Sequence, residues 1–114
     1  MPQNNQITLL ELPLKSATDL QKTKTFLTNV FNWTYTDYGD EYSDTTDSGT
    51  AFGLNATNSS TMPLTVIYSE DLEKTKELVI QNGGTIIVDT YSFPGGRRFH
   101  FTEPSGNELA VWSE

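Results

Sequence analysis

The sequence predicts an α+β fold in which two βαβββ modules form a cupped, eight-stranded mixed sheet with two outer helices. Three observations lead to this prediction. A nine-residue stretch that begins at Asp19 returns at Asp71, 52 residues later, with five of its nine positions identical. Each copy follows a short apolar stretch, and a polar, linker-like stretch separates the copies. A repeat of this kind indicates a duplicated supersecondary unit.

The first module covers about residues 7–56. Alternating apolar side chains predict its opening strand at residues 7–14. A stripe of apolar residues then predicts a helix that ends near Phe31, with Ser16, Thr18 or Asp19 as its N-cap. Turn residues and alternation predict three further strands, at residues 33–37, 41–47 and 50–56.

A linker at about residues 57–62 leads to the second module, at about residues 63–113. We expect a strand at residues 64–68 and then a helix that Gly83 ends near residue 82. Three strands follow, at residues 85–89, 97–102 and 107–112. In the last two strands the alternation places Phe99, Phe101, Leu109 and Val111 toward the helix, and Arg98, His100, Thr102 and Glu108 on the opposite face.

Length and composition limit the class of protein. A chain of 114 residues fits one domain, and the absence of cysteine excludes disulfides and thiolate chemistry. The net charge of −8 argues against binding to nucleic acid. The chain has no run of apolar residues long enough to span a membrane and no secretory signal at its start, so we expect a cytoplasmic protein. The lysine pairs Lys22/Lys24 and Lys74/Lys76 are expected on solvated helix faces.

The segment Phe101-Thr102-Glu103-Pro104-Ser105-Gly106-Asn107-Glu108-Leu109 resembles the C-terminal signature of the vicinal oxygen chelate superfamily, in its small glyoxalase/bleomycin-resistance branch. The opening Glu11-Leu12-Pro13-Leu14 and the stretch Val30-Phe31-Asn32-Trp33 resemble the start of the same family. The resemblance extends from about Ile7 to Trp112. It implies a cup that holds a ligand or a divalent metal, and a homodimer.

The chain departs from the metal-binding pattern that the resemblance implies. The metal position of the opening strand corresponds to Leu9, and that of the second module to Pro63 or Leu64. Only Glu108 matches a ligand position of the chelating members. Because one carboxylate does not make a metal site, we expect no metal cofactor; Glu108 would be a ligand only if a metal were bound.

Glu108 and His100 are the candidate catalytic pair, because a carboxylate beside an imidazole can prepare it for acid–base work. Two alternatives are that Glu108 pairs with Arg98 or Arg97, and that His100 is an ordinary polar residue of the cup. Glu11 is a second carboxylate for the cup, or else an exposed residue or a partner of Lys15. The further ligand-binding candidates are aromatic, namely Trp33, Tyr35 and Trp112, with Phe52 as a residue of the wall or the core.

We therefore expect a small-molecule-binding protein of the glyoxalase/bleomycin-resistance type. Its candidate ligand-binding residues are Glu11, Trp33, Tyr35, Arg98, His100, Glu108 and Trp112. One alternative is a lyase or isomerase of the glyoxalase type that uses Glu108 and His100, with or without a divalent metal. The other is an accessory or regulatory module without catalysis.

Overall fold

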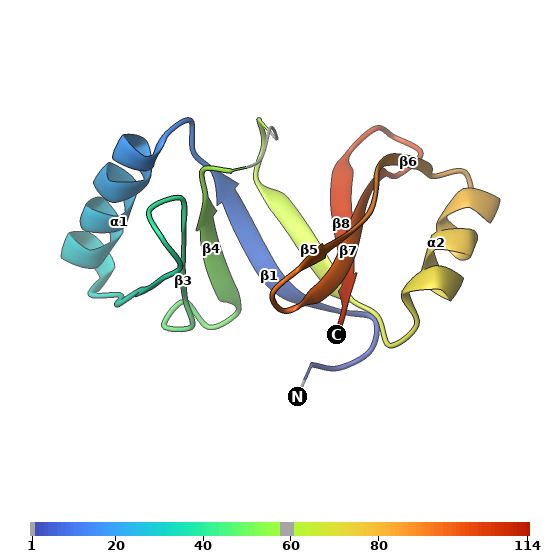
Figure 1. Cartoon of the computed structure of the whole chain (residues 1–114), viewed down its shortest axis with the longest axis horizontal. Helices are drawn as coiled ribbons and strands as arrows, with labels where there is room; N and C mark the ends of the chain where they lie inside the picture. Colours follow the sequence, from blue (N-terminus) through green and yellow to red (C-terminus); the bar gives the residue numbers. More distant parts are fainter. Residues whose placement is uncertain (1, 58–60) are drawn as a thin grey trace. The chain divides into compact units, whose positions relative to one another are not determined.

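The computed structural model describes residues 2–57 and 61–114, so residues 58–60 of the predicted linker lie outside the described part. The chain divides into two compact units. The N-terminal unit contains residues 9–64, and the C-terminal unit contains residues 65–114 together with residues 1–8. Each unit carries one helix and shows the same sequence of elements (Figure 1).

The N-terminal unit places its helix on a small sheet. Its strands occur in the order β2-β3-β4-β1, in which β1 runs parallel to β4 and the other pairs are antiparallel. The helix lies against β4. The elements are β1 (Gln6–Pro13), α1 (Ala17–Phe31), β2 (Thr36–Asp37), β3 (Tyr42–Thr45) and β4 (Ala51–Asn55).

Helix α1 begins where a capping side chain meets its free N–H groups. Ser16 is the N-cap, and its hydroxyl accepts a hydrogen bond from the N–H of Asp19 at 3.1 Å. The helix ends at Asn32, which adopts a left-handed conformation with φ of 61°. Asparagine tolerates this conformation better than most residues. Of the three caps that the sequence allows, the structure therefore uses Ser16.

The strand predicted at residues 33–37 is wrong over its first part, because β2 contains only Thr36 and Asp37. The preceding residues are held by side chains instead of a strand ladder. The N–H and hydroxyl of Thr34 donate to a carboxylate oxygen of Asp47 at 2.8 and 3.0 Å, and the hydroxyl of Thr28 donates to the carbonyl of Trp33 at 2.9 Å. These bonds satisfy polar groups that a strand would have paired.

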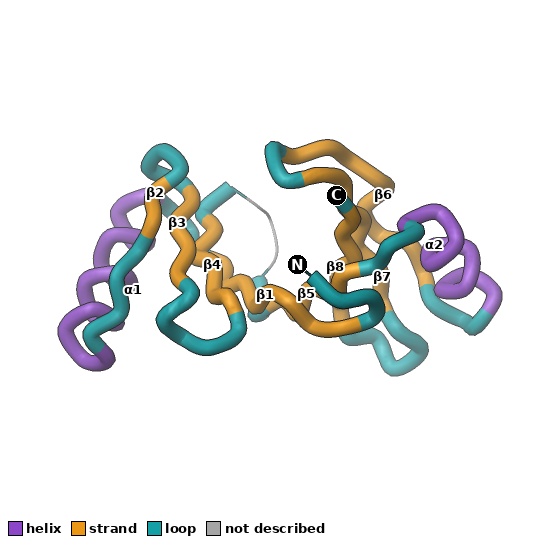
Figure 2. Tube along the Cα trace, turned by 90° about the horizontal axis from the view of Figure 1, so that it is seen from below, coloured by secondary structure: helices purple, strands orange, loops and turns teal. Residues whose placement is uncertain are grey.

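The C-terminal unit repeats the arrangement with longer strands. Their order is β5-β8-β7-β6, with β5 parallel to β8 and the other pairs antiparallel. Figure 2 shows α2 as a layer beside these strands, and it contacts β6, β7 and β8. The elements are β5 (Leu64–Tyr68), α2 (Leu72–Gln81), β6 (Thr85–Phe93), β7 (Gly96–Thr102) and β8 (Glu108–Ser113). Strand β6 is four residues longer than the predicted strand, which ended at residue 89.

The core of this unit lies between α2 and its sheet. Leu72 of α2, Phe99 of β7 and Val111 of β8 are 2 %, 0 % and 2 % exposed and pack together. The partly buried Val79, Ile86 and Phe101 surround them. The prediction that Phe99, Phe101 and Val111 face the helix is confirmed.

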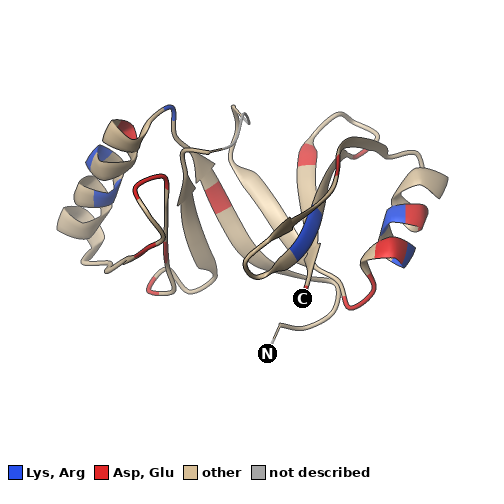
Figure 3. Cartoon of the chain, viewed as in Figure 1, with Lys and Arg blue, Asp and Glu red and all other residues tan. Residues whose placement is uncertain are grey.

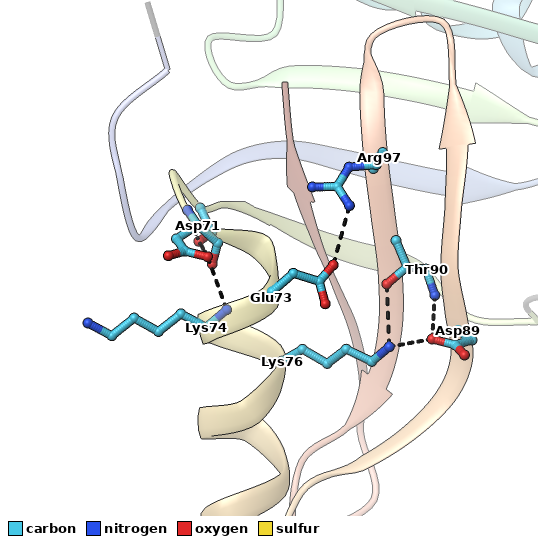
Figure 4. A network of polar contacts seen from close by, with 8 residues as sticks. Asp71, Glu73, Lys74, Lys76, Asp89, Thr90 and Arg97 are labelled. Atoms are coloured by element: carbon cyan, nitrogen blue, oxygen red, sulfur yellow. Dashed lines mark hydrogen bonds and ion pairs between the residues drawn. The ribbon is translucent and has the colours of Figure 1, made fainter.

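Two lysines of the repeat connect their helices to the strand that follows. Lys24 pairs with Asp37 at 2.7 Å, and Lys76 pairs with Asp89, which stands the same 52 residues further on (Figure 4). The hydrogen bond from each lysine is the main reason why the pKa of its aspartate lies below the usual range. The expectation that these two lysines only form solvated helix faces is therefore wrong.

Charged side chains of both signs occur on both units (Figure 3). Basic residues stand on the two helices and on β7, while acidic residues stand on β1 and β8 among other places. Neither described helix has the length and apolar character needed to cross a membrane. The described residues form eight strands, in parallel and antiparallel pairs, and two helices, so the mixed α+β fold of two βαβββ modules is confirmed.

Candidate functional site

A polar cluster lies on the face of β6, β7 and β8 that points away from α2. At its centre is His100, which is 4 % exposed. The Nδ1 atom of His100 is 2.8 Å from Oε2 of Glu108, and its Nε2 atom is 2.9 Å from the hydroxyl of Tyr91. The Nε–H of Arg98 also donates to Nε2, at 3.2 Å. The predicted meeting of His100 and Glu108 is present.

Strand register explains why these side chains meet. His100 stands opposite Ala110 and Thr102 stands opposite Glu108, so His100 and Glu108 are diagonal neighbours on one face. Diagonal neighbours on antiparallel strands are within reach of long side chains. Arg98 and His100 share this face because they are two residues apart on β7. Phe99, between them, points to the core.

The hydrogen bonds assign the tautomer of His100. A guanidinium group is always a donor, so Nε2 of His100, which accepts from Arg98, carries no proton. Nδ1 therefore carries the proton and donates it to Glu108. Nε2 has a single lone pair, which both the Arg98 N–H and the hydroxyl of Tyr91 approach. The imidazole is thus neutral in this arrangement, with a defined orientation.

Burial differs sharply within the cluster. The side chains of His100 and Glu108 are 5 % and 26 % exposed. Arg98 is 6 % exposed, whereas Tyr91 is 38 % exposed. Solvent or a ligand can therefore reach Tyr91 and Glu108. The buried His100 connects these two residues through its two ring nitrogens. Such a chain can orient hydrogen bonds or pass a proton between its two ends.

Aromatic side chains adjoin this polar cluster. Trp112 stands opposite Arg98 in the β7–β8 register, so the two side chains share a face. The indole N–H of Trp112 donates to the hydroxyl of Thr8 at 2.8 Å, which fixes the ring. Tyr68 and Phe93 lie beside Trp112, with ring centroids 4.9 and 6.1 Å away.

Tyr68 is itself held in its protonated form. Its hydroxyl donates to Glu114 at 2.9 Å, and this hydrogen bond is the largest cause of the raised pKa of Tyr68. Burial and the negative charge of Glu114 act in the same direction. The aromatic wall of Trp112, Tyr68 and Phe93 therefore stays uncharged at neutral pH.

Within the N-terminal unit, Glu11 is a buried carboxylate with two hydrogen-bond donors. It is 3 % exposed, so the alternative of an exposed carboxylate is wrong. The hydroxyl of Tyr42 donates to one of its oxygens at 3.0 Å, and the side-chain amide of Asn55 donates to the other at 3.3 Å. Gly53, directly opposite Glu11 in the β1–β4 register, leaves room for the Tyr42 ring.

Trp33 and Tyr35 lie elsewhere in the N-terminal unit. Trp33 stacks on Phe31 at 5.2 Å and meets the edge of Phe52 at 6.1 Å. Phe52 precedes Gly53 on β4, so its side chain points to the face opposite Glu11. Trp33 is therefore on the helix side of this unit and not on the face of Glu11.

Tyr35 lines a shallow hollow of about 350 Å³ beside α1. Its hydroxyl is a buried atom without a hydrogen-bond partner among the described residues, and burial raises the pKa of Tyr35. Trp33 lines the same hollow. Of the predicted ligand-binding residues, four lie together in the C-terminal unit: Arg98, His100, Glu108 and Trp112. In the N-terminal unit, Trp33 and Tyr35 lie apart from Glu11.

The donor set does not fit the divalent metal that the resemblance implies. Among the described residues, no group of three or more His, Cys, Asp or Glu side chains could hold a metal ion. The carboxylate of Glu108 is bonded to the protonated Nδ1 of His100. The side chains at the metal positions that the resemblance implies, Leu9 and either Pro63 or Leu64, have no donor atom.

Three residues of these clusters escaped the sequence analysis: Tyr42, Asn55 and Tyr91. Alternation along the strand at residues 50–56 could have indicated that Asn55 shares a face with Gly53, next to Glu11. Tyr91 could not be predicted in this way, because it lies beyond the predicted end of its strand.

Several solved structures share this fold. A glyoxalase/bleomycin resistance protein/dioxygenase superfamily member from Vibrio splendidus 12B01 superposes with a TM-score of 0.69 at 14% identity, over 93% of this chain and 97% of that chain. A protein from Legionella pneumophila described as an NAD-dependent benzaldehyde dehydrogenase gives 0.73 at 13% identity, over 92% and 96%. The Mn(II)-bound glyoxalase from Novosphingobium aromaticivorans gives 0.70 at 15% identity, over 99% of this chain and 40% of that chain.

At these sequence identities the superpositions show that the fold is shared, and they carry no information about activity. No curated protein matches the chain in sequence. The family model described as Glyoxalase/Bleomycin resistance protein/Dioxygenase superfamily matches residues 14–111, which is most of the chain. The chain belongs to the glyoxalase/bleomycin resistance protein/dioxygenase superfamily.

Proposed function

We propose that this chain is a small-molecule-binding protein of the glyoxalase/bleomycin-resistance type that works without a bound metal. The observation that carries the proposal is the pairing of a buried polar anchor with an aromatic wall on one face of β6, β7 and β8. His100 and Arg98 form the anchor, and Trp112 forms the wall. Small-molecule sites commonly combine apolar walls with a few placed polar groups.

A ligand screen followed by tryptophan substitution tests the proposal. Cationic antibiotics, glutathione adducts and aromatic metabolites are screened by thermal shift, since a ligand that binds only the folded state raises the melting temperature. For a compound that binds, we expect Trp112→Leu to weaken the affinity about tenfold or more, because a large aromatic contact is lost.

Trp33→Leu is the matched control, because Trp33 is the other tryptophan of the chain and belongs to the N-terminal unit. Both affinities are measured by titration calorimetry at a temperature where both variants are folded. A large loss of affinity in the Trp33 variant with none in the Trp112 variant would count against this face as the binding site.

The second candidate function is catalysis as a lyase or isomerase of the glyoxalase type. The 2.8 Å contact between His100 and Glu108 favours it, because Glu108 is partly exposed and its carboxylate is oriented by the imidazole. Such a carboxylate can act as a base toward a C–H group next to a carbonyl. The proton would move from carbon to Glu108 and return to the substrate.

Deuterium exchange tests this second candidate. A carbonyl compound that binds in the screen is incubated with the protein in D₂O, and we expect deuterium at the carbon beside the carbonyl. Glu108→Gln should reduce the exchange at least a hundredfold, within the usual contribution of a general base. Glu73→Gln should retain it, because the Glu73 side chain is 63 % exposed and pairs with Arg97. If the wild-type protein exchanges no faster than buffer, the chain does not catalyse this step.

A further inference from the structure

Strand β6 contains two register shifts against β7, one between Ile86 and Val88 and one between Val88 and Tyr91, and the second bears on which side chain meets His100. Val88 stands opposite His100, and Tyr91 stands opposite Arg98. The chain thus advances three residues on β6 while it advances two on β7, which is the geometry of a β-bulge. If the pairing continued regularly from Val88, Thr90 would stand opposite Arg98. The extra residue instead turns Tyr91 onto the face of His100.

The bulge is attached to helix α2. Lys76 of α2 pairs with Asp89 and lies 3.5 Å from the hydroxyl of Thr90. The carboxylate of Asp89 also accepts the backbone N–H of Thr90 at 2.8 Å. Figure 4 shows Lys76 reaching both bulge residues, while the neighbouring Lys74 extends away from them. The lowered pKa of Asp89 agrees with this arrangement.

Comparison of the two copies of the repeat separates the scaffold from the site. The N-terminal unit contains the equivalent pair, Lys24 and Asp37, but its strand β2 ends at Asp37. The residue that corresponds to Tyr91 by the 52-residue offset is Gly39. The lysine–aspartate pair is therefore common to both units, and the extended strand that carries Tyr91 is found only in the C-terminal unit.

We propose that Tyr91 is a ligand-contacting residue of this site and that Lys76 is its positioning residue. Tyr91 is 38 % exposed, its hydroxyl lies 2.9 Å from Nε2 of His100, and a phenolic oxygen has two lone pairs, so this hydroxyl can also accept a hydrogen bond from a ligand. The ring lies near the Arg98 guanidinium, 5.8 Å from the ring centroid. The site would therefore select ligands that present a hydroxyl or amino group beside an apolar ring. This inference rests on the proposed function of the same face.

A pair of probe compounds tests the inference. Phenol carries the hydroxyl, and toluene has nearly the same shape without it. We expect phenol to bind the wild-type protein more tightly than toluene, and Tyr91→Phe to reduce the phenol affinity about fivefold, as for one lost hydrogen bond. Toluene binding should be unchanged. Lys76→Met should lower the phenol affinity in the same direction, and the matched Lys74→Met should not.

The single histidine gives an independent readout, since its ring nitrogens can be observed by ¹⁵N NMR without assignment ambiguity. We expect the Nε2 signal of His100 to move in Tyr91→Phe, and to a smaller extent in Lys76→Met. An unchanged ratio of phenol to toluene affinity in Tyr91→Phe would overturn the role of Tyr91 while leaving the binding face intact. Equal behaviour of the Lys76 and Lys74 variants would overturn the positioning role. If neither probe binds the wild-type protein, the proposed binding face itself is contradicted.

Discussion

Phe99→Ala is expected to lower the free energy of unfolding of the C-terminal unit by about 3–5 kcal/mol. The Phe99 side chain is fully buried and packs against Leu72 and Val111. Its removal loses the transfer free energy of the ring and leaves a cavity between α2 and the sheet. Because small domains are stable by only about 5–15 kcal/mol, this is a large part of the total.

The measurement is urea unfolding followed by tryptophan fluorescence in a Trp33→Phe background, so that Trp112 alone reports the C-terminal unit. Phe26→Ala is the matched control, since Phe26 on α1 is 61% exposed. We expect that control to change stability by no more than about 0.5 kcal/mol. A cost below about 1 kcal/mol for Phe99→Ala would show that this residue does not anchor the core.

The substitution also bears on the candidate site. Arg98 and His100 flank Phe99 on β7, and alternation directs them to the opposite face. Packing of Phe99 against α2 therefore fixes the backbone of β7 from which His100 reaches Glu108. We expect the folded Phe99→Ala variant to bind phenol less tightly than the wild-type protein, because the polar cluster depends on the position of this part of the β7 backbone.

The fold was predictable because two signals agreed. The repeat at Asp19 and Asp71 gave the module period, and side-chain alternation gave the faces of β7 and β8. Alternation works on these strands because one face packs on α2 and must be apolar. The same alternation places His100 and Glu108 on a common face.

The positions of Trp33, Tyr35 and Tyr91 depend on contacts between distant residues, which a local sequence pattern does not reveal. Trp33 and Tyr35 alternate with polar residues as a strand would, but bonds from Thr28 and to Asp47 hold that segment outside the ladder. Tyr91 lies beyond two register shifts in β6, which interrupt the regular pairing that sequence reasoning relies on. The predicted homodimer and cytoplasmic location stay predictions.

The repeated lysines show why similarity within a chain can be misread. Pairs of lysines on a helix are typical of a solvated surface, and the sequence gives the same interpretation for both lysines of each pair. Lys24 and Lys76 instead reach strands 13 residues further along the chain, at Asp37 and Asp89. The duplicated nine-residue stretch thus carries the same helix-to-strand attachment in both units.

Gly96→Ala is expected to destabilise the C-terminal unit by about 2–4 kcal/mol, from backbone strain together with overpacking. Gly96 begins β7 with φ of 153°, a conformation that other residues rarely adopt. An added methyl group would overlap the backbone carbonyl of Ser113 at the end of β8. Backbone atoms cannot rotate away as a flexible side chain can, so the strand end must move.

Gly106→Ala separates these two contributions, since Gly106 also has a positive φ, 98°, but no atom within 4 Å of the added methyl group. We expect it to cost only about 1–2 kcal/mol. Thermal and urea unfolding of both variants give the difference. Because Arg97 pairs with Ser113 and Arg98 with Trp112, displacement of β8 in Gly96→Ala should also shift the indole N–H signal of Trp112 in NMR spectra. Equal destabilisation with an unmoved Trp112 signal would mean that the close approach of β7 to β8 at Gly96 does not hold the aromatic wall in place.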